Sequence, residues 1–547
     1  MASSIPICLL LLGYFIEGVK LSTTPVNYGY ERVSTYWYDL AEEELFATLR
    51  ERQMGVAKNV ILFLGDGMGM STVTAGRILA GQKLGKRGEE HKLSFDKFPY
   101  TGLSRTYNTN SQITDSASSA TAFLSGVKTN QGLLGLNGSA KRGICNTTTG
   151  AHAESILRWS ANAGKSTGIV TTTRVTHATP GAAYAHSAER DWESDRAVPA
   201  SEKDCEDIAL QLVVRNSDIN VIMGGGRANF YPEGYPDPNH DPTFNTTKAS
   251  RLDNRNLVEE WKSEKKARNA NHQFVYDKAG LDKVDVSKTN YLLGLFKQSH
   301  MSYEVVRNAT QEPSLTDMVE KAIGILSKNK NGFFLLVEGG RIDHGHHDTQ
   351  ASLSLHEVVA FADAVEMATR MTSKSETLMV VTADHSHVMN IAGYASRGNP
   401  ILGLSDINGA QSLKSLDKMP YTTIVYGNGP GYNSTRTNLT DVNTQDKYYV
   451  YQSAVPMKSE THGGEDVPIY ATGPHSVLFT GVHEQNYIPM AVAYASCVGP
   501  YEKGKKGCAK QEIEVVPPIK CKVSNSNTLN KSSTILAVLS LLLVIYL

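Results

Sequence analysis

The sequence predicts an α/β protein with a large, mostly parallel central β-sheet that is flanked by helices on both faces. Several apolar runs are continuous rather than alternating, which is typical of strands buried on both sides. Helical patterns lie between these runs, and such alternation indicates parallel strands joined by crossover helices. The apolar runs are residues 60–64, 169–170, 220–226, 332–336 and 378–381, and the helical patterns are residues 153–163 and 315–326.

Length and charge narrow the classes of protein. The chain has 547 residues, 40% of them hydrophobic, which is ample for a large core. Length alone would suggest three or four domains. The formal net charge is −1 and the pI is near 7, so there is no electrostatic reason to expect nucleic-acid binding.

The N-terminal end has the character of a secretory signal. Residues 5–16 form an apolar block that is followed by small and polar residues, so we expect residues 1–20 to be a signal peptide. Several N-x-S/T sequons also favour secretion and glycosylation. They begin at Asn137, Asn146, Asn245, Asn308, Asn433 and Asn438.

The C-terminal end is also apolar. Residues 535–547 reach the terminus but would span only about 20 Å as a helix, whereas a bilayer core needs about 30 Å. Small residues and a polar spacer precede them. Residues 524–547 are therefore predicted to be a glycosylphosphatidylinositol attachment signal, with the modified residue near Ser524 or Asn525. The alternative is a short tail-anchor helix.

The six cysteines fit an oxidising compartment. No CxxC or Cys-His spacing appears, so a structural zinc site is not expected. We expect one disulfide across the middle of the chain and one near its end. The predicted pairs are Cys145 with Cys205 and Cys497 with Cys508, whereas Cys8 lies in the signal peptide and Cys521 is unassigned.

Ionisable side chains follow several of the predicted strands. In a parallel sheet the carboxyl ends of the strands meet at one edge, where ligands bind. Several acids brought together there need cations, so a metal site with several ions is favoured over polar surface loops. The side chains concerned are Asp66, His177, Thr179, Glu338, Asp343, Asp384 and His385.

The ligand types indicate which metals would bind. Imidazole mixed with carboxylate suits zinc, and open positions would make the site catalytic. Oxygen ligands alone, as in Asp66, Thr179 and Glu338, suit magnesium. The four-residue spacing of Asp343 and His347 places both on one face of a helix. The intervening or adjacent His344, His346 and Asp348 are then expected to point elsewhere.

A candidate nucleophile opens a helix of small residues. Asp115 and Ser116 stand at its start, where either could be an N-cap, and a helix N-terminus favours anions. Because no GxSxG elbow is present, Ser116 would need activation by a metal.

Two further residues gain a role only if such a metal site exists. Near metal ions, the Arg190 guanidinium could bind two phosphoryl oxygens, whereas an isolated arginine in a loop is usually a surface charge. His462 is followed by two glycines, and an isolated histidine in such a segment would more often have a structural role.

Six segments together resemble the alkaline phosphatases of the animal, membrane-attached type. They are, in the order of that family, FLGDGMG, TDSASSATA, TTTRVTHATP, VEGGRIDHGHHD, TADHSHV and ETHGGEDV. The similarity runs from about Tyr36 to Gly499. It implies one domain over residues 21–523, with a small insert, the crown, at about residues 396–458.

The resemblance also implies two Zn²⁺ and one Mg²⁺ per subunit. Arg190 would bind two phosphate oxygens and be steadied by Asp115. The implied ligands are Asp343, His347 and His462 for the first zinc, Asp66, Asp384, His385 and Ser116 for the second, and Asp66, Thr179 and Glu338 for magnesium, with His177 close by.

The implied activity is hydrolysis of phosphate monoesters of broad range, through a phosphoserine, at the outer cell surface. The implied assembly is a homodimer in which Tyr394 reaches the partner's active site. A phosphodiesterase or sulfatase of the same architecture and a non-catalytic surface glycoprotein are the alternatives. Some animal relatives carry a calcium site, but the matching positions here are Asn239, Phe296, Lys297 and Glu312, so no fourth ion is expected.

Overall fold

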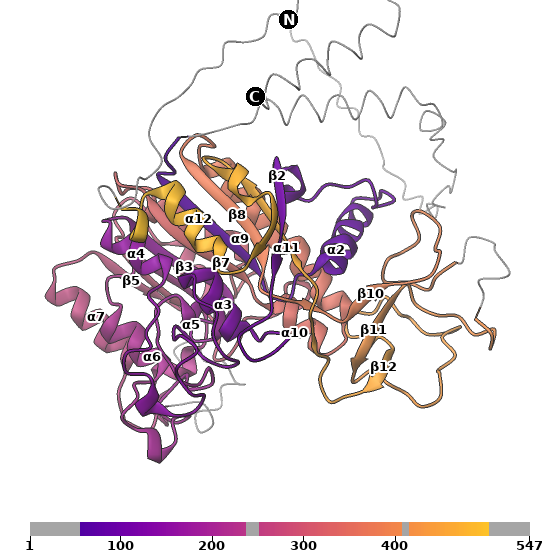
Figure 1. The fold of residues 1–547 in the computed structure, drawn as a ribbon, viewed down its shortest axis with the longest axis horizontal. Coiled ribbons are helices and arrows are strands. Elements are labelled where there is room, and N and C mark those ends of the chain that lie inside the picture. The colour runs from indigo at the N-terminus through magenta and orange to yellow at the C-terminus, as the bar shows by residue number, and fades with distance from the viewer. Residues whose placement is uncertain (1–54, 237–250, 407–414, 503–547) are drawn as a thin grey trace, which may run out of the picture.

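A ten-stranded β-sheet forms the centre of the molecule, as the computed structural model shows for residues 55–236, 251–406 and 415–502 (Figure 1). Most neighbouring strands are parallel, whereas β14 runs antiparallel to β8 and β2, so the predicted fold class is confirmed. The strand order is β15 (Gly481–Glu484), β2 (Tyr100–Arg105), β14 (Val467–Thr472), β8 (Thr377–Ala383), β1 (Asn59–Gly65), β7 (Phe333–Gly339), β3 (Ser166–Arg174), β4 (Val221–Gly225), β6 (Tyr291–Leu295) and β5 (His272–Val275).

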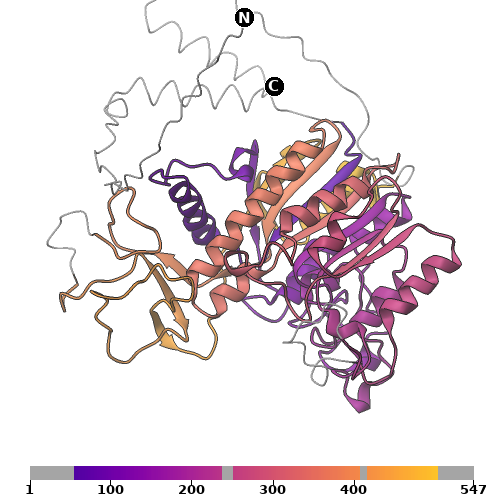
Figure 2. The same ribbon diagram turned by 180° about the vertical axis from the view of Figure 1, so that it is seen from behind.

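Helices cover both faces of this sheet. In β1, Leu62 and Leu64 face one hydrophobic core, whereas Ile61 and Phe63 face the other. The helices on the first face are α3 (Ser116–Ser125), α4 (Ile156–Asn162), α5 (Ala178–Ala182), α6 (Ile208–Leu210), α7 (Leu257–Ala267) and α12 (Tyr487–Ser496) (Figure 1). Those on the second are α2 (Met70–Lys83), α8 (Lys278–Asp282), α9 (Leu315–Leu326) and α11 (Ala351–Met371) (Figure 2).

Capping residues set the helix boundaries. The helix expected at residues 315–326 is α9, and Ser314 and Asp317 form a capping box at its start. The helix expected from residue 153 begins three residues later, because the Ser155 side chain accepts a hydrogen bond from the Arg158 amide.

A smaller sheet lies beside one end of the main sheet. It contains β10 (Met389–Ile391), β11 (Ile424–Gly429) and β12 (Ser453–Pro456), at the right of Figure 1. Its apolar residues, which include Ile424 and Tyr451, form one core with residues of α2 and α11. Two of its strands fall in the predicted crown. In a separate two-stranded sheet, β9 (Ser386–His387) pairs with β13 (His462–Gly463).

The structure confirms one predicted disulfide, Cys145–Cys205. Cys497 is also disulfide-bonded, but its expected partner Cys508 lies outside the described residues. Cys8, Cys521 and both predicted terminal signals lie outside them as well. In the part of the chain that is described, no helix has the length and apolarity needed to cross a membrane.

Candidate active site

Adjacent strand ends bring four carboxylates together. Asp66 follows β1, Asp384 follows β8, and Glu338 lies near the end of β7, paired in register with Leu64. Asp343 lies on the short helix α10 (Arg341–His347), which follows β7. None of the four is more than 3% exposed. The predicted convergence of acids at the carboxyl edge of the sheet is therefore present.

The first ligand group consists of Asp343, His347 and His462. Asp343 Oδ1 lies 3.3 Å from His347 Nε2 and 3.4 Å from His462 Nε2, and the two nitrogens are 3.3 Å apart. Tetrahedral zinc with bonds of about 2.0–2.1 Å needs ligand atoms about 3.3–3.4 Å apart. Each Nδ1 faces a carbonyl, of Glu460 at 2.6 Å and of Thr114 at 2.8 Å. Both Nε2 atoms can therefore offer lone pairs to a metal.

The second ligand group surrounds His385. Its Nε2 lies 3.0 Å from Asp384 Oδ2, 3.5 Å from Asp66 Oδ1 and 3.2 Å from Ser116 Oγ. The Gly67 amide donates to Asp384 Oδ1 at 3.0 Å and fixes that carboxylate. This group also has spacings that suit a four-coordinate ion, and it includes the candidate nucleophile.

The third ligand group contains buried polar atoms that lack hydrogen bonds. They are both carboxylate oxygens of Asp66, Thr179 Oγ1, Glu338 Oε1 and His177 Nδ1. Asp66, His177 and Glu338 each direct a potential ligand atom to within 4.8 Å of the others. Buried polar atoms normally have partners, so this concentration fits a cation bound mainly by oxygen.

The electrostatics also call for added positive charge. Burial, followed by the charges of Asp384 and Asp343, raises the pKa of Asp66 well above its usual range. Burial raises the pKa of Glu338 to about 7. Burial would also raise the pKa of Asp384, but the His385 imidazole lowers it to about 2. His385 therefore compensates the charge of Asp384, whereas the raised pKa values of Asp66 and Glu338 indicate charges that bound ions would have to compensate.

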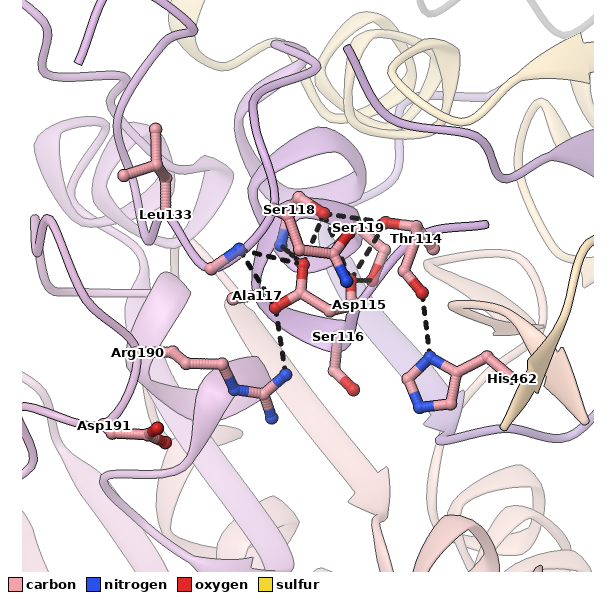
Figure 3. Close-up of polar contacts among 12 residues, drawn as sticks. Thr114, Asp115, Ser116, Ala117, Ser118, Ser119, Leu133, Arg190, Asp191 and His462 are labelled. Atoms are coloured by element: carbon pink, nitrogen blue, oxygen red, sulfur yellow. Dashed lines mark hydrogen bonds and ion pairs between the residues drawn. The ribbon is translucent and has the colours of Figure 1, made fainter. Parts of the chain in front are cut away.

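Ser116 is the first residue of α3, and Asp115 caps that helix. Asp115 accepts a hydrogen bond from the Ser118 amide at 3.2 Å and forms an ion pair with Arg190 at 3.0 Å. Figure 3 shows the Ser116 hydroxyl pointing into the space between the Arg190 guanidinium and the His462 ring. A phosphoryl group in this space would meet the serine, the guanidinium and the metal ligands together.

Sequence reasoning missed two residues of this site, His387 and Glu460. His387 Nε2 lies 2.7 Å from Asp343 Oδ1, and its Nδ1 lies 2.5 Å from Glu460 Oε2. Burial lowers the pKa of His387, but the two carboxylates raise it to about 10. Both residues stand in segments that carry the family resemblance, but no spacing distinguishes them as partners.

Three further polar residues in or just after α10, His344, His346 and Asp348, lie outside the first ligand group, as predicted. His346 is buried between the hydroxyls of Thr72 at 3.0 Å and Tyr426 at 2.9 Å. Asp348 is exposed, and His344 is half-buried.

His344 belongs to a cluster of three histidines with His177 and His300. Arg341 Nη1 lies 3.0 Å from His344 Nδ1, and Arg174 Nη1 lies against His300 Nε2. A guanidinium can only donate, so these ring nitrogens accept from it. The lone pairs of these two ring nitrogens are therefore already engaged, and the positive charges of Arg341 and Arg174 lie beside them, so that a metal ion is disfavoured in this cluster.

The positions compared with a calcium site are only partly described, because Asn239 lies outside the described residues. Phe296 is buried, and Lys297 Nζ lies 3.7 Å from Glu312 Oε2. The chain therefore places its own cation beside that acid. The absence of a fourth ion remains a prediction.

Fold and site together define a class of α/β proteins that gather potential metal ligands beside a serine at the carboxyl edge of a parallel sheet. The family model for alkaline phosphatase matches residues 57–498. The chain therefore belongs to the alkaline phosphatase family. It is a metal-dependent enzyme that hydrolyses phosphate monoesters.

Individual relatives agree with this assignment. The tissue-nonspecific alkaline phosphatase of Mus musculus is 52% identical over 476 residues, which cover 86% of this chain and 90% of the relative. An alkaline phosphatase of Gadus morhua is 51% identical over 474 residues, covering 85% and 97%. The fold resembles the alkaline phosphatase from the Antarctic bacterium TAB5, with a TM-score of 0.56 and 23% identity, over 82% of this chain and all of the other.

Proposed function

We propose that the enzyme works through a phosphoserine at Ser116, with two zinc ions and one magnesium ion per subunit. The observation that best supports this is the near-tetrahedral spacing of the first ligand group. The proposed ligands are Asp343, His347 and His462 for one zinc, Asp66, Asp384, His385 and Ser116 for the other, and Asp66, Thr179 and Glu338 for magnesium, beside His177.

Ions bound there would supply Lewis acidity, lowering the pKa of the Ser116 hydroxyl and of water and neutralising the departing alkoxide. Ser116 releases its proton to solvent, and its Oγ then forms a bond to phosphorus. The bond from phosphorus to the alcohol oxygen breaks, and the alkoxide takes a proton from water. Arg190 and the N-terminus of α3 offset the charge of the transferring phosphoryl group.

In the second step, water attacks phosphorus from the side that the alcohol left. The bond from phosphorus to Ser116 Oγ breaks, that oxygen regains a proton from solvent in place of the one that the attacking water gives up, and inorganic phosphate departs. Two in-line displacements retain the configuration at phosphorus. The proposed ligands and Arg190 surround the phosphoryl group rather than the alcohol, which supports a broad range of monoester substrates.

Acid quenching during turnover tests the intermediate. Mass spectrometry of the quenched protein should find phosphate on Ser116 and not on Ser118 or Ser119 of the same helix. Ser125→Ala, at the far end of α3, should accumulate as much phosphoserine as the wild type. Absence of phosphate from Ser116 under conditions of steady turnover would refute the intermediate.

We also propose a homodimer in which Tyr394 reaches the partner's active site. Its side chain is 68% exposed, so it is free to make such a contact. Sedimentation at micromolar concentration should show a dimer, and a monomer only would count against this assembly.

For the cellular location, we propose secretion and a lipid anchor at the outer cell surface. Residues 1–20 would be the signal peptide, 21–523 the enzyme with its crown at about 396–458, and 524–547 the removed anchor signal. Exposed sequon residues Asn146, Asn308, Asn433 and Asn438 support glycosylation. A phosphatidylinositol-specific phospholipase should release activity from cell membranes. Activity that stays bound, with Leu547 present in the mature protein, would exclude the anchor.

A further inference from the structure

Glu460 occupies a central place behind the first ligand group. It lies two residues before His462 and is only 1% exposed. Its carboxylate accepts hydrogen bonds from His387 Nδ1 at 2.5 Å and from the Val388 amide at 2.7 Å. Its backbone amide donates to the His347 carbonyl at 2.9 Å, and its carbonyl accepts from His347 Nδ1 at 2.6 Å.

These contacts connect Glu460 to every member of the first ligand group. His387 links the Glu460 side chain to Asp343, because its Nε2 donates a hydrogen bond to Asp343 Oδ1 at 2.7 Å. His347 is held by the backbone of Glu460, and His462 follows it closely in the chain. We propose that Glu460 is a positioning residue, which holds Asp343 through His387 and so sets the affinity of the metal beside the departing alcohol.

The charges explain why a carboxylate is needed at this position. Both ring nitrogens of His387 face carboxylate oxygens, which only accept hydrogen bonds, so both nitrogens carry protons. Glu460 Oε2 and Asp343 Oδ1 therefore hold the ring from its two nitrogens. An amide at residue 460 would replace one of these two carboxylate contacts by a weaker one, so that His387 would hold Asp343 less firmly.

The contact between His387 and Glu460 depends on two neighbouring glycines. Gly67 has φ of +68°, and a Cβ there would lie 2.3 Å from His387 Nε2. A Cβ at Gly429 would lie 3.0 Å from Glu460 Cβ. Two glycines therefore leave just enough room for the pair.

The inference rests on the proposed function, and zinc binding without substrate separates the two. Full-length protein would be titrated with a chromophoric chelator that competes for zinc. Glu460→Gln should release one of its two zinc ions about 10- to 100-fold more readily than the wild type, as is usual for lost support of a ligand. Glu465→Gln, the same change at an exposed residue just after His462, should behave as the wild type.

A double variant tests whether Glu460 acts through His387. Glu460→Gln combined with His387→Gln should bind zinc no more weakly than the weaker single variant, because both changes interrupt one chain of contacts. Additive losses would contradict this route. Excess zinc should restore much of the turnover of Glu460→Gln, which a general loss of folding would not allow.

The outcomes distinguish the two proposals. If the wild type holds no tightly bound zinc, the proposed function fails. If the wild type holds two zinc ions and Glu460→Gln keeps both with unchanged affinity, only the positioning role is overturned. Should Glu460→Gln not fold, Glu460→Asp keeps the charge but shortens the reach, and unchanged zinc affinity in that variant would equally overturn the role.

Discussion

Two regions at the carboxyl edge of the sheet bury acids in different ways. In the active site, Asp66, Glu338, Asp343 and Asp384 converge, and the nearby Arg190 is already paired with Asp115. Beyond β6, Glu312 is also buried, at 3% exposure. There Lys297 Nζ lies 3.7 Å away, and the Ser302 amide donates to the carboxylate at 2.6 Å.

The difference shows how a chain can be made to need metal ions. A buried carboxylate is costly unless it is paired or hydrogen-bonded. Beyond β6 the chain supplies the cation itself. In the active site Asp66 has no hydrogen bond to either oxygen, so that charge compensation must come from solution.

The largest effect should come from Ser116→Ala, which removes the nucleophile but leaves all the buried carboxylates. We expect turnover to fall by at least about 10³-fold. Metal content, measured by elemental analysis, should remain at three ions, because Ser116 contributes no charge in its resting form. Ser125→Ala is the control. Near-normal turnover would rule out the nucleophile, and loss of two or more ions would contradict charge compensation as the reason for binding.

Replacing Arg190 removes the guanidinium that lies beside the nucleophile. Arg190→Met should reduce kcat/KM by about 10²- to 10³-fold, as loss of a preorganised charge in an active site does. Arg190→Lys should recover only part of this, because an ammonium cannot hold two oxygens as a guanidinium does. Inhibition by inorganic phosphate gives a second measurement. Equal phosphate affinity in wild type and Arg190→Met would exclude the clamp.

Much of this architecture follows from the sequence, because local signals report it. Continuous apolar runs mark the strands, and the residues after Leu64 and Val381 are then placed at the sheet edge. The spacing of Asp343 and His347 depends only on helix geometry. These local signals do not assign each ligand to an ion, and only the family resemblance does so.

The contact between His387 and Glu460 was not predictable in this way. The two residues are 73 positions apart. They meet because His387 pairs with His462 in a ribbon of two short strands. Strands of two residues leave no periodic pattern. A buried carboxylate that acts through a second side chain therefore requires the folded structure to be recognised.

Metal removal should reverse the pH dependence of stability at the active site. In the metal-free protein burial holds the pKa of Glu338 at about 7, against an ordinary value of 4.5. Glu338 thus contributes its full share of stability below pH 4.5. That share, on the order of 3 kcal/mol, is lost as the pH rises through 7. The ions bind the ionised form, so their stabilisation instead grows with pH.

Urea unfolding at pH 5 and pH 8, with and without bound metal, measures this difference. The free energy of unfolding should fall from pH 5 to pH 8 in the metal-free protein, and the gain on adding metal should rise. Glu338→Gln cannot ionise, so its metal-free form should show a weaker fall. The same fall in Glu338→Gln as in the wild type would assign the effect to other groups.

The smallest effects are expected beyond β6, where the chain provides its own cation. Lys297→Met should lower the free energy of unfolding by about 1 kcal/mol, since the lysine side chain is 35% exposed and solvent weakens the pair. Lys288→Met removes a more exposed lysine that pairs with Asp285, so it should lower the free energy of unfolding by less.

A charge reversal at the same position tests the link to calcium. Lys297→Glu would place a second acid beside Glu312, so the melting temperature of this variant should fall in chelator and rise with added calcium. The wild type should not respond to calcium, because Lys297 repels a dication beside Glu312. An equal rise in wild type and Lys297→Glu would show that this region needs an ion after all.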